Sequence, residues 1–419
     1  MATVSANVSV QPPRTATRAL VLVLAALTAV SPLATDMYVP GFPTLGHALH
    51  AGSSAVQLTM TAYLAGLVVG QLIIGPVSDG IGRRRLLICG VTAFIACSIA
   101  CALVASIGLL TGARFLQGVA GASGTVLARA VLTDRFRGAE LPRYIAVLSQ
   151  IMGLAPIAAP ILGGLVLSVS TWRAVFVVLA ATGVALLLGV LRAVPESLPP
   201  ERRQGGGIGS TFRAMGSLLR VRAFTGYVLV LGCSAAALFS YIAGSSFVFE
   251  DIHGVSATVY SLIFASNAVG MLIAGATFAR LAPRVRLNTL LTAGVVLTAV
   301  GALAQVGLRL VVGETLVGTW ITLFFTVGAI GLIFPATMSI GQTMNRRTPG
   351  AASALLGGCQ FLLGALASPL VGVFGTGSSL PMALVMLAAA ACGLAALLGL
   401  ARPWEGHGEP ILTSHVDGA

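Results

Sequence analysis

The hydrophobic pattern of this chain is a series of long apolar runs separated by short polar segments. Each run has about 20 residues, the length that an α-helix needs to cross the hydrocarbon core of a bilayer. The pattern therefore predicts twelve membrane-spanning helices, at residues 18–40, 54–77, 86–105, 107–132, 141–168, 173–192, 223–249, 256–279, 287–308, 315–341, 350–375 and 380–401. The division between the third and fourth helices is placed near Ser106.

The composition agrees with a chain that lies in lipid. Of its 419 residues, 57% are hydrophobic and only 9% are charged, and the mean hydropathy is +0.97. Soluble domains carry about 25% charged residues, so this chain cannot form an ordinary wet surface. We expect an all-α integral membrane protein whose surroundings are the lipid bilayer.

The basic residues give a topology. All 24 are arginine, and twenty of them fall on alternate loops; the opposite loops hold Arg173 and Arg309, and Arg114 and Arg129 lie in the fourth span. Because positive loops stay inside, both termini are expected in the cytoplasm of a protein of the inner (plasma) membrane. The first helix is expected to be retained rather than cleaved as a signal peptide. Arginines scattered over short loops do not form a phosphate-binding patch, so no nucleic-acid partner is expected.

One long polar segment, 193–222, divides the chain. It holds prolines, three successive glycines and several arginines. We expect it to be a cytoplasmic linker between two six-helix bundles, 18–192 and 223–401, flanked by cytoplasmic tails at 1–17 and 402–419. Six plus six helices is a common architecture of secondary transporters. A monomer is expected.

The turn between the second and third helices carries a dense motif. Its pattern G-x-x-x-D-x-x-G-R-R resembles the signature loop of the major facilitator superfamily, and its residues here are Gly75, Asp79, Gly82, Arg83 and Arg84. Gly80 stands where that family usually has arginine. The resemblance implies a major facilitator fold. We expect Asp79, Arg83 and Asp134 to form a latch that assembles only when the cytoplasmic side is closed; the alternative for Asp134 is a plain helix end in water.

Two ionisable residues lie at membrane depth, where a charge is costly and usually functional. Asp36, in the outer half of the first helix, is a candidate proton site, or else an interfacial residue at the start of a loop. Arg114, on the fourth helix, is estimated at the same depth, so both are expected to face one cavity; alternatively Arg114 reaches the outer interface. The R-x-x-Q-G around Arg114 and Gln117 resembles the family's fourth-helix motif.

Further polar residues within the spans are cavity candidates or interhelical hydrogen-bonding groups. They are Tyr38, Gln117, Tyr241, Asn267 and Gln360.

The fifth helix is rich in proline and glycine, which bend helices and allow close packing. Its residues Gly153, Pro156, Pro160, Gly163 and Gly164 include P-x-x-G-G, which resembles the motif of proton-antiporting exporters. Ala159 replaces the usual preceding glycine.

Several other stretches resemble the bicyclomycin/chloramphenicol-resistance type of drug exporter. They include Asp36-Met37-Tyr38-Val39-Pro40, Gly153-Leu154-Ala155-Pro156 and Trp172-Arg173-Ala174. The resemblance spans about residues 18–400 and implies a proton-driven exporter of small hydrophobic drugs working by alternating access. The alternatives are an exporter of an endogenous metabolite or natural product, and a proton-independent facilitator.

No other class of protein fits the sequence as well. A membrane enzyme needs a cluster of His, Cys or acidic residues at depth, and only Asp36 and Arg114 are charged there. A channel needs a filter or a charged ring. The six cysteines have no disulfide or metal-ligand spacing, and His47 and His50, assigned to an outer loop, have no third ligand nearby. We therefore expect no catalysis, cofactor or metal; the partners are protons and a small-molecule substrate whose identity the sequence does not specify.

Overall fold

The computed structural model describes residues 14–136, 140–203, 213, 215–344, 349–375 and 377–409, and within these ranges it is helical and contains no β-strand. Twelve helices of this described part are long and apolar enough to cross a membrane. The all-α, twelve-span prediction is therefore confirmed.

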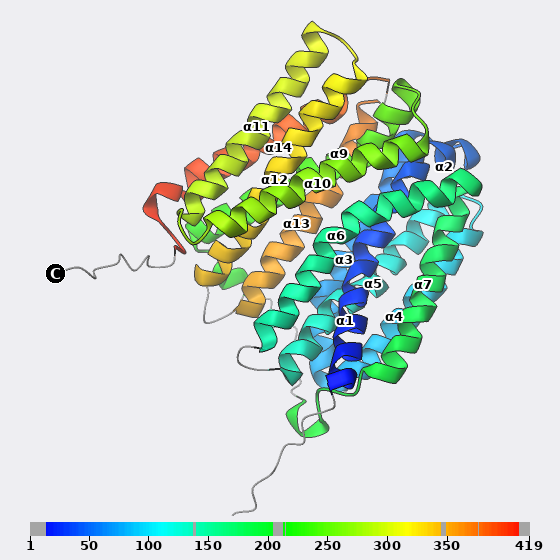
Figure 1. The fold of residues 1–419 in the computed structure, drawn as a ribbon, viewed down its shortest axis with the longest axis vertical. Helices are drawn as coiled ribbons and strands as arrows, with labels where there is room; N and C mark the ends of the chain where they lie inside the picture. Colours follow the sequence, from blue (N-terminus) through cyan, green and yellow to red (C-terminus); the bar gives the residue numbers. More distant parts are fainter. Residues whose placement is uncertain are drawn as a thin grey trace, which may run out of the picture.

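The first bundle contains six of these helices (Figure 1). They are α1 (Arg14–Asp36), α3 (Ser53–Ile81), α4 (Arg83–Leu103), α5 (Ile107–Arg135), α6 (Glu140–Val169) and α7 (Trp172–Ala193). The boundary between α4 and α5 falls where predicted. The Ser106 hydroxyl accepts a hydrogen bond from the Leu109 N–H at 3.4 Å and caps α5.

The second bundle contains the other six, and two of them end in short π-helical segments. The helices are α9 (Arg222–Ser246), α10 (Ala257–Leu281), α11 (Leu287–Val311), α12 (Leu316–Met344), α13 (Pro349–Val373) and α14 (Leu380–Ala396). The π-helical segments η3 (Phe247–Ile252) and η4 (Leu397–Ala401) continue α9 and α14.

The first membrane span differs from the single helix expected at 18–40. Helix α1 ends at Asp36, and the chain bends into a 3₁₀ turn, η1 (Val39–Gly41), and a short helix, α2 (Phe42–Ala48). Pro40 explains the break, because a proline has no N–H to bond the carbonyl four residues earlier, here that of Asp36, and its ring clashes with that carbonyl. His47 consequently lies in α2 rather than in a loop, with His50 just after it.

The two bundles contact each other along two seams, α3 with α13 and α6 with α10. The end of the molecule that carries α2 is here called the α2 end; the opposite end is the terminal end. At the α2 end, the rings of Phe42 and Phe247 are 6.1 Å apart, and Gln57 hydrogen-bonds the backbone of α9 and α13. The α2 end is therefore closed.

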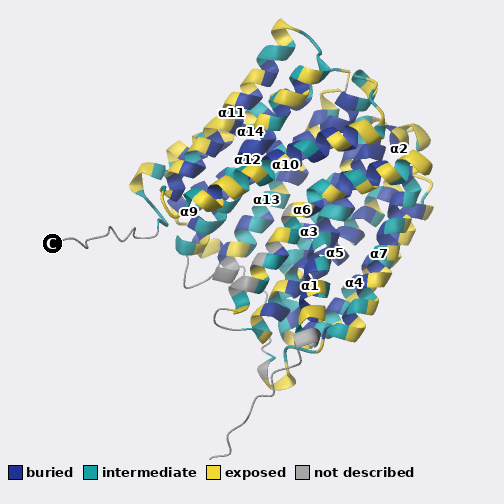
Figure 2. Cartoon of the chain, in the orientation of Figure 1, coloured by how far each residue is buried: buried dark blue, intermediate teal, exposed yellow. Residues whose placement is uncertain are grey.

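The distribution of buried and exposed residues is the one expected of helices that lie in lipid (Figure 2). Buried positions face the interior of each bundle, whereas large apolar side chains such as Leu103, Leu310 and Phe325 are exposed on the outer faces of the helices. Apolar side chains on these faces suit hydrocarbon rather than water. All six cysteines lie in helices and are free.

Candidate functional site

Asp36 is the last residue of α1 and lies at the bend between α1 and η1. The residue is only 4% exposed, and among the described residues its carboxyl makes no hydrogen bond or ion pair. The hydroxyls of Tyr63, Tyr241 and Tyr260 are its electrostatic neighbours. Burying a carboxylate without a counter-charge is costly.

The paired glycines of α6 bring this helix against the Asp36 bend and against the other bundle. A Cβ on Gly163 would overlap the backbone carbonyl of Met37, the residue that follows Asp36. A Cβ on Gly164 would overlap the Ser261 hydroxyl of α10. Pro156 and Pro160 lie inside the same helix, as predicted. The motif therefore connects the Asp36 bend, α6 and α10 through close packing.

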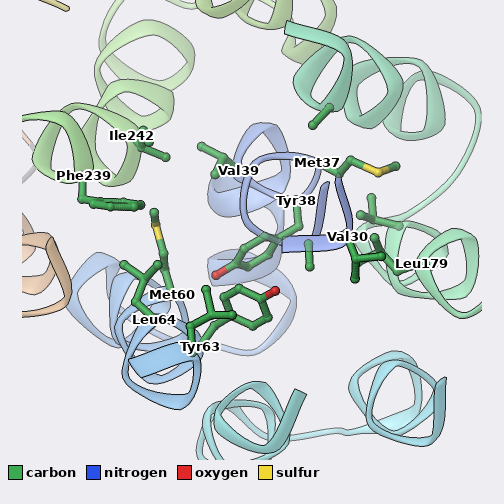
Figure 3. Packing of buried hydrophobic residues seen from close by; sticks show 14 of the residues in the cluster. Val30, Met37, Tyr38, Val39, Met60, Tyr63, Leu64, Leu179, Phe239 and Ile242 are labelled. Carbon is green, nitrogen blue, oxygen red and sulfur yellow. The ribbon is translucent and has the colours of Figure 1, made fainter. Parts of the chain in front are cut away.

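Arg114 is fully buried and forms no ion pair with Asp36, and the expectation that both residues face one cavity stays a prediction. Its guanidinium lies between two aromatic rings, 4.3 Å from the centroid of Tyr38 and 4.2 Å from that of Tyr63. Its Nη1 donates to Gln117 Oε1 at 2.6 Å. Figure 3 shows the two tyrosines side by side in the core of the first bundle. The aromatic faces stabilise the cation in place of an anion.

Gln117 and Tyr38 complete this buried network. The Gln117 Nε2 donates to the Ser98 hydroxyl at 2.7 Å, and the hydroxyls of Tyr38 and Thr59 are 3.0 Å apart. Both predicted residues therefore make interhelical hydrogen bonds within the first bundle, which was the alternative considered for them.

The candidates of the second bundle form a separate cluster. Asn267 Nδ2 donates to the Tyr241 hydroxyl at 2.9 Å, and the Tyr241 ring stacks on Phe264 with centroids 5.3 Å apart. The buried Oδ1 of Asn267 has no partner in the described part of the chain. Gln360 is half-buried on α13. Asn267 thus keeps one acceptor unused close to Tyr241, a neighbour of Asp36.

The three members of the predicted latch meet at the terminal end. Arg83 Nη2 lies 2.6 Å from Asp79 Oδ1, and Arg83 Nε donates to Asp134 Oδ2 at 3.1 Å. All three belong to the first bundle, on α3, α4 and α5. The pairs join helices of one bundle and do not join the two bundles. They are present while the α2 end is closed.

Sequence reasoning missed an acidic residue that is part of this turn. Glu196, just after α7, accepts the backbone N–H groups of Arg83 at 2.9 Å and Arg84 at 3.3 Å. The Ser197 hydroxyl donates to Asp134 Oδ2 at 2.9 Å. Gly82, at φ +100°, has no room for a Cβ because Glu196 Oε2 would lie 2.7 Å from it. Glu196 was detectable in principle, because it is one of only twelve acidic residues and directly follows a span.

The second bundle repeats this arrangement with Glu409. Its carboxylate accepts the backbone N–H groups of Leu287 at 3.2 Å and Asn288 at 2.9 Å, at the start of α11. In each bundle, therefore, a glutamate beyond the sixth helix caps the N-terminus of the third. A carboxylate at this position interacts favourably with the helix dipole.

Two six-helix bundles related by such a repeat, a buried carboxyl at a helix break and a charged turn define a polytopic membrane transporter of the two-bundle class. The family model described as Major Facilitator Superfamily matches residues 24–369. The chain therefore belongs to the Major Facilitator Superfamily, whose members are transporters rather than enzymes, as predicted.

Known proteins resemble the chain over most of its length. An uncharacterized MFS-type transporter, YdgK of Bacillus subtilis, is 38% identical over 92% of this chain and 96% of its own. A bicyclomycin resistance protein homolog of Haemophilus influenzae is 28% identical over 87% and 92%. The crystal structure of a D-xylose-proton symporter superposes with a TM-score of 0.72 at 15% identity, covering 91% of this chain and 96% of the other. That structural likeness supports the fold alone.

Proposed function

We propose that the protein exports small hydrophobic drugs or antibiotics from the cytoplasm in exchange for protons. The observation that carries the proposal is Asp36, a buried carboxyl without a partner in the described part of the chain, at a break in the first helix. Relatives named for bicyclomycin and chloramphenicol resistance support the substrate class. The arginine distribution supports placing the terminal end in the cytoplasm of the inner membrane, and the α2 end outside.

In the proposed cycle, the closed α2 end separates Asp36 from the outer medium. A neutral Asp36 is compatible with this state, because an ionised carboxylate there would have no counter-charge. Opening the α2 end hydrates the bend and gives Asp36 access to external protons. Drug binding from the cytoplasm then favours release of the proton inward. Protons and drug thus move in opposite directions, each bound in a different arrangement of the two bundles.

The residues around Asp36 have supporting roles in this proposal. Gly163 and Gly164 transmit motion of α10 to the Asp36 bend, because both glycines are in close contact with their neighbours. Tyr241, Asn267 and Gln360 contribute polar groups to the substrate path of the second bundle. Arg114 and Gln117 hold Tyr38 from within the first bundle.

The test compares Asp36→Asn with Asp36→Glu in everted membrane vesicles loaded with protons. Addition of bicyclomycin, chloramphenicol or a lipophilic dye should release protons from vesicles that contain the natural protein. We expect Asp36→Asn to lose this release completely and to retain drug binding in equilibrium dialysis, because the amide cannot carry a proton. Asp36→Glu keeps a carboxyl and should retain part of the release.

Two outcomes would contradict the proposal. Proton release by Asp36→Asn at the natural rate would remove Asp36 as the proton site. If the natural protein transports drug at a rate that does not depend on the proton gradient, a proton-independent facilitator is favoured. If it transports none of the drugs tested, an exporter of an endogenous metabolite is favoured.

A further inference from the structure

Gln57 connects the two bundles through its side-chain amide. It lies one turn into α3 and is completely buried. Its Nε2 donates to the Ala243 carbonyl of α9 at 3.1 Å, and its Oε1 accepts the Gly372 N–H of α13 at 2.8 Å. Both partners are backbone groups of the second bundle, so one side chain of the first bundle binds two helices of the other.

The two partner helices have local features that make these bonds possible. The Phe247 N–H, which would bond the Ala243 carbonyl in a regular α-helix, donates to the Gly244 carbonyl where the π-helical segment begins. This leaves the Ala243 carbonyl available to Gln57; π-helical turns often mark functional sites. On α13, a Cβ on Gly372 would lie 2.6 Å from Gln57 Oε1 and 2.7 Å from the Ser54 Cα.

The amide is completely buried, and apolar side chains pack further along α3 and α9. Figure 3 shows Phe239 and Ile242 of α9 facing Met60 and Leu64 of α3. An apolar seam of this kind can slide, whereas a buried amide with two backbone partners is satisfied in one register only. The amide therefore specifies how the two bundles meet.

We propose that Gln57 is the clasp of the gate at the α2 end, a positioning residue that sets the balance between the closed and open states of this end. The inference rests on the proposed transport cycle, in which the α2 end opens. Opening separates α3 from α9 and α13 and breaks both hydrogen bonds. Two such bonds are sufficient to favour the closed state about tenfold.

The experiment measures how often the α2 end opens. Val39 is completely buried at this end, so the variant Val39→Cys, in a chain whose six native cysteines are replaced by alanine, reacts with a membrane-impermeant maleimide only when the end is open. The reaction rate is proportional to the open population even when that population is small. We expect Gln57→Leu, which has similar size and no amide, to raise the rate about tenfold.

Matched variants separate a clasp from a general packing effect. Gln57→Asn is too short for both partners, and Gly372→Ala places a Cβ against Gln57 Oε1; both should also raise the rate. Gln71→Leu changes the same residue type further along α3 and should leave it unchanged. A reporter at Val175→Cys, in the core of the first bundle, should stay unreactive throughout, which shows that the bundle itself remains folded.

Unchanged labelling at Val39→Cys in folded Gln57→Leu and Gln57→Asn proteins would overturn the proposal. It would also be overturned if all three clasp variants failed to fold while Gln71→Leu folded, because Gln57 would then be a purely structural residue. The measurement uses neither drug nor proton gradient. If Gln57→Leu raises the labelling rate in a protein that exports no drug, the proposed role of Gln57 is therefore supported and only the proposed function is rejected.

Discussion

Arg114 lies inside the first bundle and forms no ion pair in the part of the chain that the structure describes. Aromatic rings provide the compensation: Tyr38, Tyr63 and Phe176 lie within 4.2–5.7 Å of its guanidinium carbon. Its Nε and Nη2 are buried and have no hydrogen-bond acceptor in the described part of the chain. Cation–π contacts are therefore the main interactions that hold this cation, apart from the bond to Gln117.

This geometry predicts that lysine cannot replace Arg114. A compact, strongly hydrated ammonium cannot lie flat between two rings. We expect Arg114→Lys to lose about 2 kcal/mol of stability, the size of a desolvated cation–π interaction, and to unfold at a lower temperature in detergent. Arg129→Lys is the control, because Arg129 lies on the same helix and is exposed. Equal unfolding temperatures for both variants would show that stacking does not stabilise the bundle.

At this scale the sequence identified the unusual residues better than their partners. Asp36 and Arg114 were recognisable because charges are rare within apolar runs. Their partners were not, because the rings around the guanidinium come from the bend after α1, from α3 and from α7, and no local pattern reports that Tyr38 and Tyr63 both contact it. Gln57 was missed for the same reason: an isolated glutamine in a span has no sequence signal that distinguishes a clasp from an ordinary interhelical bond.

At the scale of the elements, the N-terminus of the third helix in each bundle is capped by a glutamate that follows the sixth helix of the same bundle. Glu196 caps α4 and also accepts the N–H groups of Ser197 and Leu198, each at 3.1 Å. Glu409 caps α11 and accepts the Asn288 side-chain amide at 2.9 Å. These contacts fasten the start of the linker and the chain beyond α14 to the terminal end of their own bundles.

The caps lead to a stability prediction for each bundle. Glu196→Gln keeps the size of the side chain but removes the charge that the helix N-terminus favours, so we expect a loss of about 1 kcal/mol. The expected decrease in Tm is about 2–4 °C for a bundle of this size. Glu409→Gln should act similarly on the second bundle.

Limited proteolysis of the linker gives a second measurement of the first cap. Cleavage within 193–222 should be faster in Glu196→Gln than in the natural protein, because the start of the linker is no longer fastened. Glu201→Gln is the matched control, since Glu201 lies in the same linker and is exposed. The capping role is refuted if Glu196→Gln and Glu201→Gln unfold and are cleaved alike.

Element boundaries were largely predictable because a span must be long and apolar, and the division near Ser106 coincides with the residue whose hydroxyl caps α5. The first span was the exception. Its apolar run continues through Pro40, so hydropathy alone extended the helix. Pro40 has no N–H for the Asp36 carbonyl and its ring clashes with that carbonyl, so α1 ends at Asp36. The break is central to the proposed function, since it places the carboxyl at a bend against which Gly163 packs.

For the whole molecule, the charged cluster at the terminal end belongs to one bundle while the α2 end is closed. Arg83 is buried and pairs with Asp79 and Asp134, whose side chains are 45% and 19% exposed. Asp134 also accepts a hydrogen bond from Ser197 and so lies within the bundle's own network. Asp79 is the member whose carboxylate is available to a neighbouring surface when the terminal ends of the bundles approach each other.

This difference predicts separate effects for the two aspartates. If Asp79 contributes to closing the terminal end, Asp79→Asn should lower the transport rate about fivefold, the effect of about 1 kcal/mol for a half-exposed charged pair. Drug binding should be retained. A cysteine probe at the terminal end should become more reactive, because the arrangement that is open at this end gains population. Asp134→Asn should instead reduce the amount of folded protein, since it removes a partner of both Arg83 and Ser197. Slower transport by Asp79→Asn with unchanged probe reactivity would mean that the cluster supports folding of the first bundle and takes no part in the alternation.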